Sequence, residues 1–159
     1  MTHSFECKAT WRGGLDGCGT LACSALETNF SAPALLNGSG QGTNPEELLL
    51  AASSTCFLIT LSALLNQANK AVSCLSLQSE ITVAAHASYS IKSIHHQLRV
   101  TFKPGSQKGV IDQVKGLTQR AEQLCMVSKA IRPNVSVRVT PEFIVGHEYE
   151  IPSNPIAPI

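Results

Sequence analysis

The order of elements in this 159-residue chain predicts an α+β fold. Two short strands, a long apolar helix, two further strands, an amphipathic helix and a last strand follow one another. This grouping favours antiparallel sheets with the helices gathered on one side. A chain of this length usually builds one core, so we expect residues 1–159 to form a single domain, with a loosely ordered tail over residues 150–159.

Two strands open the chain. Ser4 to Trp11 and Gly19 to Leu26 are separated by a turn-rich run from Arg12 to Gly17, which predicts a β-hairpin. Residues 28–43 follow as a loop rich in Ser, Pro, Ala and Gly. Its end, Gly38 to Gly42, has the glycines of a phosphate-binding loop, but no strand directly precedes it. We therefore interpret this stretch as a flexible approach to the next helix.

A long helix is predicted to begin after Asn44. Asn44 is a favourable N-cap, Pro45 suits the first helical position, and the acidic Glu46 and Glu47 complement the positive end of the helix dipole. The apolar pattern continues to about Asn69 and covers almost every face of the helix. A chain of this size can hardly cover that surface alone, which predicts a homodimer with the helix at or near the interface.

The same helix raises the question of a membrane. Leu48 to Leu65 is eighteen residues without a charge, at the lower limit for a membrane-spanning helix. A single marginal span in a chain otherwise patterned like a soluble domain is more simply a helix buried on all sides by protein. We therefore expect no contact with a membrane.

The second half of the chain predicts the remaining elements. Strands are expected at residues 75–87 and 91–102, where apolar and polar residues alternate along the second of them. Apolar residues at helical spacing predict an amphipathic helix over about residues 110–125. A short helical turn at residues 129–131 and a strand at residues 134–139 complete the order.

Composition limits the classes of function. Only 14% of the residues are charged, with 12 basic against 11 acidic, so the chain lacks the basic field of a nucleic-acid binder. Met1 to Thr10 lacks the apolar segment of a secretory signal, which makes the cytoplasm the expected location. In that reducing compartment the six cysteines are expected to act as individual thiols. No CxxC or local cysteine–histidine spacing supports a zinc site.

Two motifs carry a resemblance to a known family. The first is the run Gly42 to Leu49 (GTNPEELL), followed by Ala51-Ala52 and Cys56-Phe57, and the second runs from Ala121-Glu122 to Cys125 and on through Val127 to Ala130. Together, about 70 residues apart, they resemble the OsmC/Ohr family of osmotically inducible and organic hydroperoxide resistance proteins. The order of elements agrees over roughly residues 3–140. The resemblance implies an OsmC-like fold and an intertwined homodimer.

The resemblance also implies an activity. It would be a thiol-dependent peroxidase that reduces organic hydroperoxides or hydrogen peroxide to the alcohol or water. By position, Cys56 would be the peroxidatic cysteine, Cys125 the resolving cysteine, and Glu46 the carboxylate that orients an active-site arginine. In relatives the reductant is a small dithiol or a lipoylated protein, and neither metal nor flavin takes part, so no cofactor is expected.

These residue types also suit the chemistry on general grounds. A thiolate that attacks an O–O bond becomes a sulfenic acid, which a second thiol must condense with before over-oxidation. Burial in an apolar helix disfavours the Cys56 thiolate, so a nearby positive group is expected, and an arginine fits best because it stays charged. Glu46 lies about 15 Å from Cys56 along a straight helix. It must therefore act through an arginine, act in the other subunit, or serve only the helix dipole.

The chain lacks the family's active-site arginine at both positions where the family carries it. One branch carries the arginine in a GGRDG turn, where this chain has Leu15, and the other carries it eight residues before the Asn of the NPE motif, at Leu36. Arg12, beside the first turn, is the nearest substitute, and Arg132 is a second candidate. Met126 replaces the proline that usually follows the second cysteine. We therefore expect a divergent member of the family.

The missing arginine leaves a second hypothesis open. A non-catalytic dimer could keep the fold and bind a small molecule in an apolar pocket at its interface, or sense an oxidant through Cys56. The histidines do not separate the two hypotheses, because His95 and His96 point to opposite faces of a strand while His86 and His147 lack motif partners. The other cysteines are interpreted as strand or loop packing residues: Cys7, Cys18, Cys23 and Cys74.

Overall fold

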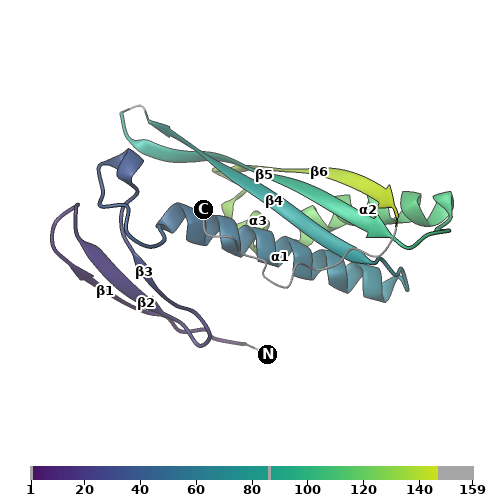
Figure 1. Ribbon diagram of the computed structural model, residues 1–159, viewed down its shortest axis with the longest axis horizontal. Helices are drawn as coiled ribbons and strands as arrows, with labels where there is room; N and C mark the ends of the chain where they lie inside the picture. Colours follow the sequence, from purple (N-terminus) through teal and green to yellow (C-terminus); the bar gives the residue numbers. More distant parts are fainter. Residues whose placement is uncertain (1, 86, 147–159) are drawn as a thin grey trace. The chain divides into compact units, whose positions relative to one another are not determined.

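The computed structural model describes residues 2–85 and 87–146, so His86, His147 and the predicted tail lie outside the described residues. The elements are β1 (Lys8–Arg12), β2 (Cys18–Ala22), β3 (Glu27–Phe30), the 3-10 helix η1 (Ala34–Leu36), α1 (Pro45–Gln67), β4 (Cys74–Ala85), β5 (Tyr89–Phe102), α2 (Lys108–Leu124), α3 (Met126–Ile131) and β6 (Ser136–Val145) (Figure 1). The predicted α+β class is confirmed. Backbone contacts divide the chain into two compact units, residues 1–51 and 52–159, with the boundary inside α1.

The N-terminal unit is built on a three-stranded antiparallel sheet in the order β1-β2-β3. The predicted hairpin of β1 and β2 is confirmed, with Thr10 opposite Thr20. The strand β3 was not predicted, because Glu27–Phe30 lies in a polar stretch that resembles a loop. The ring of Phe30 in β3 lies 5.5 Å from the ring of Trp11 in β1. This aromatic contact across the small sheet helps to hold β3 in place beside β2.

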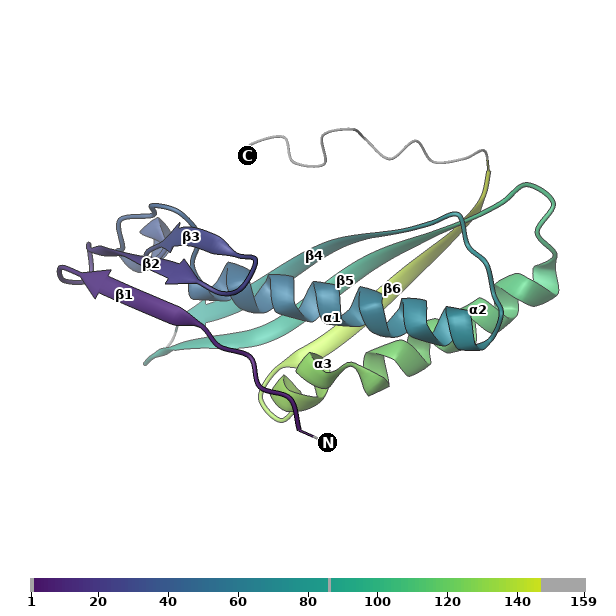
Figure 2. The ribbon, with the colours of Figure 1, turned by 90° about the horizontal axis from the view of Figure 1, so that it is seen from below.

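The second unit contains a three-stranded sheet in the order β4-β5-β6. The strands β4 and β5 are antiparallel as predicted, but β5 and β6 pair in parallel, so this sheet is mixed. The physical reason is the connection: α2 and α3 carry the chain back along the sheet before β6 begins, as a crossover between parallel strands requires. The helices α2 and α3 and most of α1 lie over one face of this sheet (Figures 1 and 2).

The core of the second unit lies between that sheet face and the helices. Inward residues of β5 alternate as the pattern predicts, and Leu98, Val100 and Phe102 are almost completely buried. They pack with Phe57 of α1 and Val114 of α2 in one apolar cluster. Each such side chain contributes about 1.5–3 kcal/mol by leaving water. This cluster fixes the position of α1 against the sheet.

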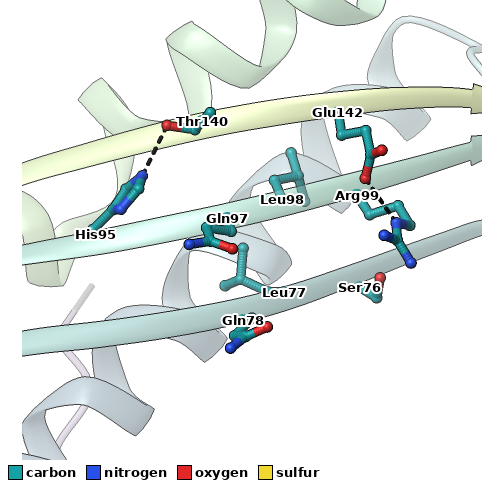
Figure 3. A pocket seen from close by; sticks show the side chains of 9 residues that line it. All are labelled: Ser76, Leu77, Gln78, His95, Gln97, Leu98, Arg99, Thr140 and Glu142. Carbon is teal, nitrogen blue, oxygen red and sulfur yellow. Dashed lines mark hydrogen bonds and ion pairs between the residues drawn. The ribbon is translucent and has the colours of Figure 1, made fainter.

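The opposite face of the sheet is polar. Its strands carry Arg99 and Glu142, joined by an ion pair of 2.9 Å, and His95, whose Nε2 lies 2.8 Å from Oγ1 of Thr140 (Figure 3). His95 therefore points outward, while His96 is fully buried, as predicted. The hollow over these strands, about 390 Å³, belongs to the face away from the helices.

The helix α1 is buried on one side only within the chain. Its buried residues Ser53, Phe57 and Leu61 face the core, whereas Ile59 is 70% exposed. Among the described residues, α1 is the helix that is long and apolar enough to cross a membrane, and 28% of its most apolar stretch is buried. Its inner side packs against the sheet, but within this one chain the helix is not buried on all sides as the sequence predicts. It ends at Gln67, two residues before Asn69 adopts a left-handed conformation with φ of 51°.

Candidate active site

Two thiols from distant parts of the sequence meet in the second unit. Cys56 lies in the middle of α1, and Cys125 lies between α2 and α3. The Sγ–H of Cys125 donates to the Sγ of Cys56 over a distance of 2.8 Å. Both cysteines are reduced in this structure. Only a small movement separates this contact from the bonding distance of a disulfide, which is about 2.05 Å.

Helix ends hold Cys125 in place. Its backbone has φ of −55° and ψ of 122°, which ends α2, while its N–H still donates to the carbonyl of Ala121. The same residue is the N-cap of α3, because its Sγ accepts a hydrogen bond from the N–H of Ser128 at 3.4 Å. The side chain is fully buried. Cys125 is therefore a fixed partner, and Cys56, which is only half-buried, is the more accessible thiol.

Hydrogen bonds lower the pKa of Cys56. Burial is the largest single influence and acts in the opposite direction, since it disfavours the charged thiolate. The contact with Cys125 and the main-chain N–H groups of Val127 and Met126 together outweigh that burial, with a smaller contribution from the side chain of Thr60. Cys56 is thus the thiol that ionises more easily.

The pKa of Cys125 moves the other way. Burial raises it first, and the neighbouring sulfur of Cys56 raises it further, both as a hydrogen-bond acceptor and as a like charge. A protonated Cys125 next to an ionised Cys56 agrees with the direction of the hydrogen bond, from Cys125 to Cys56. The two thiols are chemically different although they touch.

The sequence prediction missed the two backbone donors at Cys56. It expected a positive side chain, whereas the N–H groups of Met126 and Val127 come from the first turn of α3. A proline has no N–H, so the proline that usually occupies this position in the family could not make the first of these contacts. The replacement by Met126, which is a departure from the family, therefore adds a donor. Of the two donors, only Met126 could be noticed in the sequence, because it stands where the family usually has proline.

A buried polar network joins α1 to the sheet one turn before Cys56. His96 of β5 is stacked against Phe57, with ring centroids 5.7 Å apart. Its Nε2 lies 3.0 Å from Oγ of Ser53, and its Nδ1 lies 2.7 Å from Oγ of Ser79, which accepts a hydrogen bond from Ser54. Because Ser79 accepts from Ser54, its own hydrogen can point to Nδ1, and the neutral ring then donates from Nε2 to Ser53. This network fixes the turn of α1 that precedes Cys56.

The network predicts a loss of stability in mild acid. Burial lowers the pKa of His96, the nearby His95 lowers it further, and Glu122 acts in the opposite direction. The unfolded chain therefore binds a proton at His96 at a higher pH than the folded chain does. The stabilisation is fully present above about pH 6.5, the ordinary histidine value, and is lost as the pH falls toward the folded pKa. Urea unfolding between pH 5 and pH 7.5, both approximate limits, measures the slope.

The variant His96→Gln is the control for this pH dependence. Gln can hydrogen-bond with both serines but does not titrate, so its free energy of unfolding should vary less with pH over this window than that of the wild type. Equal slopes in the two proteins would contradict the assignment to His96.

Glu46, Arg12 and Arg132 each have different local contacts. Glu46 lies in the first turn of α1, and its buried Oε2 has no hydrogen-bond partner among the described residues. Arg12 ends β1 and lines a polar hollow of about 320 Å³ within the N-terminal unit. Arg132 is occupied by an ion pair of 2.8 Å with Glu122. Glu46 thus has an unused acceptor, while Arg132 already has a carboxylate partner.

The part of the chain that the structure describes contains no cluster of side chains suited to bind a metal ion. No three His, Cys, Asp or Glu side chains come together there. In the second unit, the described residues do bring together the two sulfurs of Cys56 and Cys125. Fold and site therefore define an α+β protein with a paired-thiol site.

Comparison with known proteins gives the family. The family described as OsmC-like protein matches residues 38–140, which is more than half of the chain and includes Cys56 and Cys125. The chain belongs to this family of OsmC-like proteins.

Similar proteins extend over nearly the whole chain. YmaD of Bacillus subtilis, an uncharacterized protein, is 33% identical over 147 residues, which cover 92% of this chain and 98% of YmaD. An organic hydroperoxide resistance protein of Xanthomonas axonopodis pv. citri is 31% identical over 143 residues, covering 86% of this chain and 93% of that protein. The crystal structure of an organic hydroperoxide resistance protein OsmC from Legionella pneumophila has a TM-score of 0.69 at 22% identity, and the match covers 89% of this chain and 99% of that one. This last likeness confirms the fold.

Proposed function

We propose that this protein is a two-cysteine thiol peroxidase that reduces organic hydroperoxides or hydrogen peroxide. The observation that carries the proposal is the contact of 2.8 Å between the sulfurs of Cys56 and Cys125. Its support is chemical as well as geometric, because Cys56 has a lowered pKa and Cys125 a raised one. A peroxidase needs this difference, since the attacking sulfur must be ionised and the second must wait as a thiol.

The proposed reaction has two steps at these sulfurs. The Cys56 thiolate attacks one oxygen of the hydroperoxide, the O–O bond breaks, and the alkoxide leaves as the alcohol after taking a proton. Cys56 is now a sulfenic acid. The sulfur of Cys125 then attacks that of Cys56, water leaves, and a disulfide forms. Two thiols have been oxidised, and one hydroperoxide has been reduced to an alcohol and water.

The reducing step needs an external dithiol. By resemblance to the family, we propose a small dithiol or a lipoylated protein, which attacks the disulfide and is itself oxidised to a disulfide. We also propose the cytoplasm as the location, because a reducing compartment supplies such dithiols.

The role proposed for Glu46 requires an arginine. Its buried and unpaired Oε2 favours a cationic partner, since a buried carboxylate oxygen without a partner is costly. Arg12 is our proposed partner, as the substitute for the family arginine, and it could come from either copy in a homodimer. The homodimer is supported by α1, whose exposed side carries Ile59.

Met126→Pro is expected to raise the pKa of Cys56. The change removes one N–H donor, and a hydrogen bond to a charged group contributes about 1.5 kcal/mol. Because Cys56 is partly open to solvent, we expect its alkylation by iodoacetamide near neutral pH to slow by roughly threefold to tenfold. Proline fits here, since Met126 is the first residue of α3 and the preceding Cys125 already has an extended backbone.

Met126→Ala is the matched control, because alanine keeps the N–H while removing the same side chain. Its alkylation rate should stay at the wild-type value. Equal slowing in both variants would assign the effect to the methionine side chain instead of the backbone donor.

Thiol counting tests the proposed activity. The reduced protein is mixed with cumene hydroperoxide and its free thiols are counted over time. Prompt loss of two thiols, with Cys56 and Cys125 recovered as one disulfide-linked peptide pair, is the expected result. Thiols that stay reduced would support the alternative that the missing arginine at Leu15 and Leu36 favours, a non-catalytic dimer that binds a small molecule.

A further inference from the structure

A second pair of cysteines lies at the open end of the N-terminal hairpin. The strands β1 and β2 are antiparallel, and their last paired residues at this end are Lys8 and Ala22. One step further along the same register, Cys7 stands opposite Cys23. The sequence separates these two residues by fifteen others and carries no motif that joins them.

The hydrogen bonds around Cys23 define the kind of pair it makes with Cys7. The N–H of Cys23 donates to the carbonyl of Leu26 at 2.8 Å, so it points toward β3. In a central strand, a residue whose polar groups face one neighbour is non-hydrogen-bonded toward the other. Continued one step beyond Lys8 and Ala22, the register therefore gives Cys7 and Cys23 a non-hydrogen-bonded antiparallel position. At such a position Cα atoms lie about 4.5 Å apart and side chains approach closely. That separation falls within the range that a disulfide accepts.

The two side chains are close and accessible. Both cysteines are exposed. The pKa of Cys7 is raised, chiefly by its hydrogen bond with Cys23, then by slight burial and by the like charge of Cys23. This influence of Cys23 on Cys7 agrees with the position opposite each other that the register gives the two residues.

We propose that Cys7 and Cys23 form a second dithiol–disulfide couple, which exchanges with low-molecular-weight disulfides such as glutathione disulfide. The thiolate of one of the two cysteines attacks one sulfur of the small disulfide, and one small thiolate leaves. The thiolate of the other cysteine then attacks the protein sulfur of this mixed disulfide, and the second small thiolate leaves. Two protein thiols are oxidised to one disulfide, and one small disulfide is reduced to two thiols.

The proposed couple uses different sulfurs from the proposed peroxidase pair. Its residues lie in the N-terminal unit, whereas Cys56 and Cys125 belong to the second unit. Its oxidation closes a loop from residue 7 to residue 23, which ties the segment before β1 to the end of β2. A closed loop restricts the unfolded chain, so the oxidised form should unfold at a higher urea concentration.

The test uses the full chain with Cys56→Ser and Cys125→Ser, so that oxidation at that pair does not contribute. The protein is equilibrated in buffers of reduced and oxidised glutathione, quenched in acid, alkylated and digested. We expect a disulfide-linked peptide pair that joins Cys7 to Cys23, with an abundance that rises as the buffer becomes more oxidising. Replacing either Cys7 or Cys23 by Ser should remove this linked pair and leave the other residue as a mixed disulfide with glutathione.

Cys18→Ser is the matched control on the same hairpin. Cys18 is also exposed, but the register sets it opposite Arg12. Its removal should leave the Cys7–Cys23 link unchanged. The proposal is overturned if Cys7 and Cys23 stay separately modified by glutathione in the most oxidising buffer, or if the link joins either of them to Cys18. A link that forms normally in a protein without peroxidase activity would leave this proposal standing.

Discussion

Cys56→Ser is expected to abolish hydroperoxide reduction. The serine hydroxyl is not ionised near neutral pH and does not form a sulfenic acid, so the first step of the proposed reaction has no nucleophile. Removal of an enzyme's nucleophile commonly lowers the rate by a thousandfold or more, and we expect a loss of at least roughly that size. The measurement is consumption of cumene hydroperoxide in the presence of a dithiol such as dihydrolipoamide.

The fold should survive this change, because Cys56 is only half-buried and serine is similar in size. A circular dichroism spectrum of Cys56→Ser that matches the wild-type spectrum would verify that the fold is kept. Cys74→Ser is a suitable comparison, since it changes another half-buried cysteine away from the thiol pair and should keep full activity. If Cys56→Ser kept substantial turnover while Cys74→Ser lost it, the assignment of the peroxidatic sulfur would be wrong.

Cys125→Ser is expected to separate the first step from the second. The Cys56 thiolate should still reduce a single equivalent of hydroperoxide, but its sulfenic acid would then lack the sulfur that lies 2.8 Å away. Repeated turnover with a dithiol should fall sharply. Mass spectrometry should find Cys56 as a sulfenic acid, trapped by dimedone, or as the over-oxidised sulfinic and sulfonic acids at higher peroxide.

The first turnover should also be slower in Cys125→Ser. The hydrogen bond from Cys125 is the largest of the influences that lower the pKa of Cys56, and a serine hydroxyl at this place reaches less far toward Cys56. Normal multiple turnover in this variant would contradict a resolving role for Cys125. A normal sulfenic acid yield with lost turnover would support it.

The sequence was sufficient for the parts of the fold that depend on residue type. The N-cap, proline and acidic residues from Asn44 to Glu47 predicted where α1 begins, and β5 alternates as expected. These features follow from local chemistry, which a single chain displays directly. Cys56 and Cys125 were selected instead by the resemblance of their two motifs to the OsmC/Ohr family, and the structure brings their sulfurs into contact.

Features that depend on pairing were not predictable. The strand β3 is polar and short, so only its partner β2 makes it a strand. The parallel pairing of β6 with β5 follows from the path of α2 and α3, which no single segment records. The buried contact of His96 with Ser53 and Ser79 joins three separate elements. The N–H donors from Met126 and Val127 belong to the main chain, which every residue type shares.

The unequal exposure of the two sulfurs has a consequence for how the protein would be recycled. Cys125 is sealed inside the chain, while Cys56 is partly open to solvent. A reductant arriving at the oxidised pair would therefore reach the sulfur of Cys56, the same atom that met the peroxide. Oxidant and reductant would therefore use the same solvent-exposed side of Cys56 in turn. A bulky peroxide bound at that side would slow reduction of the disulfide.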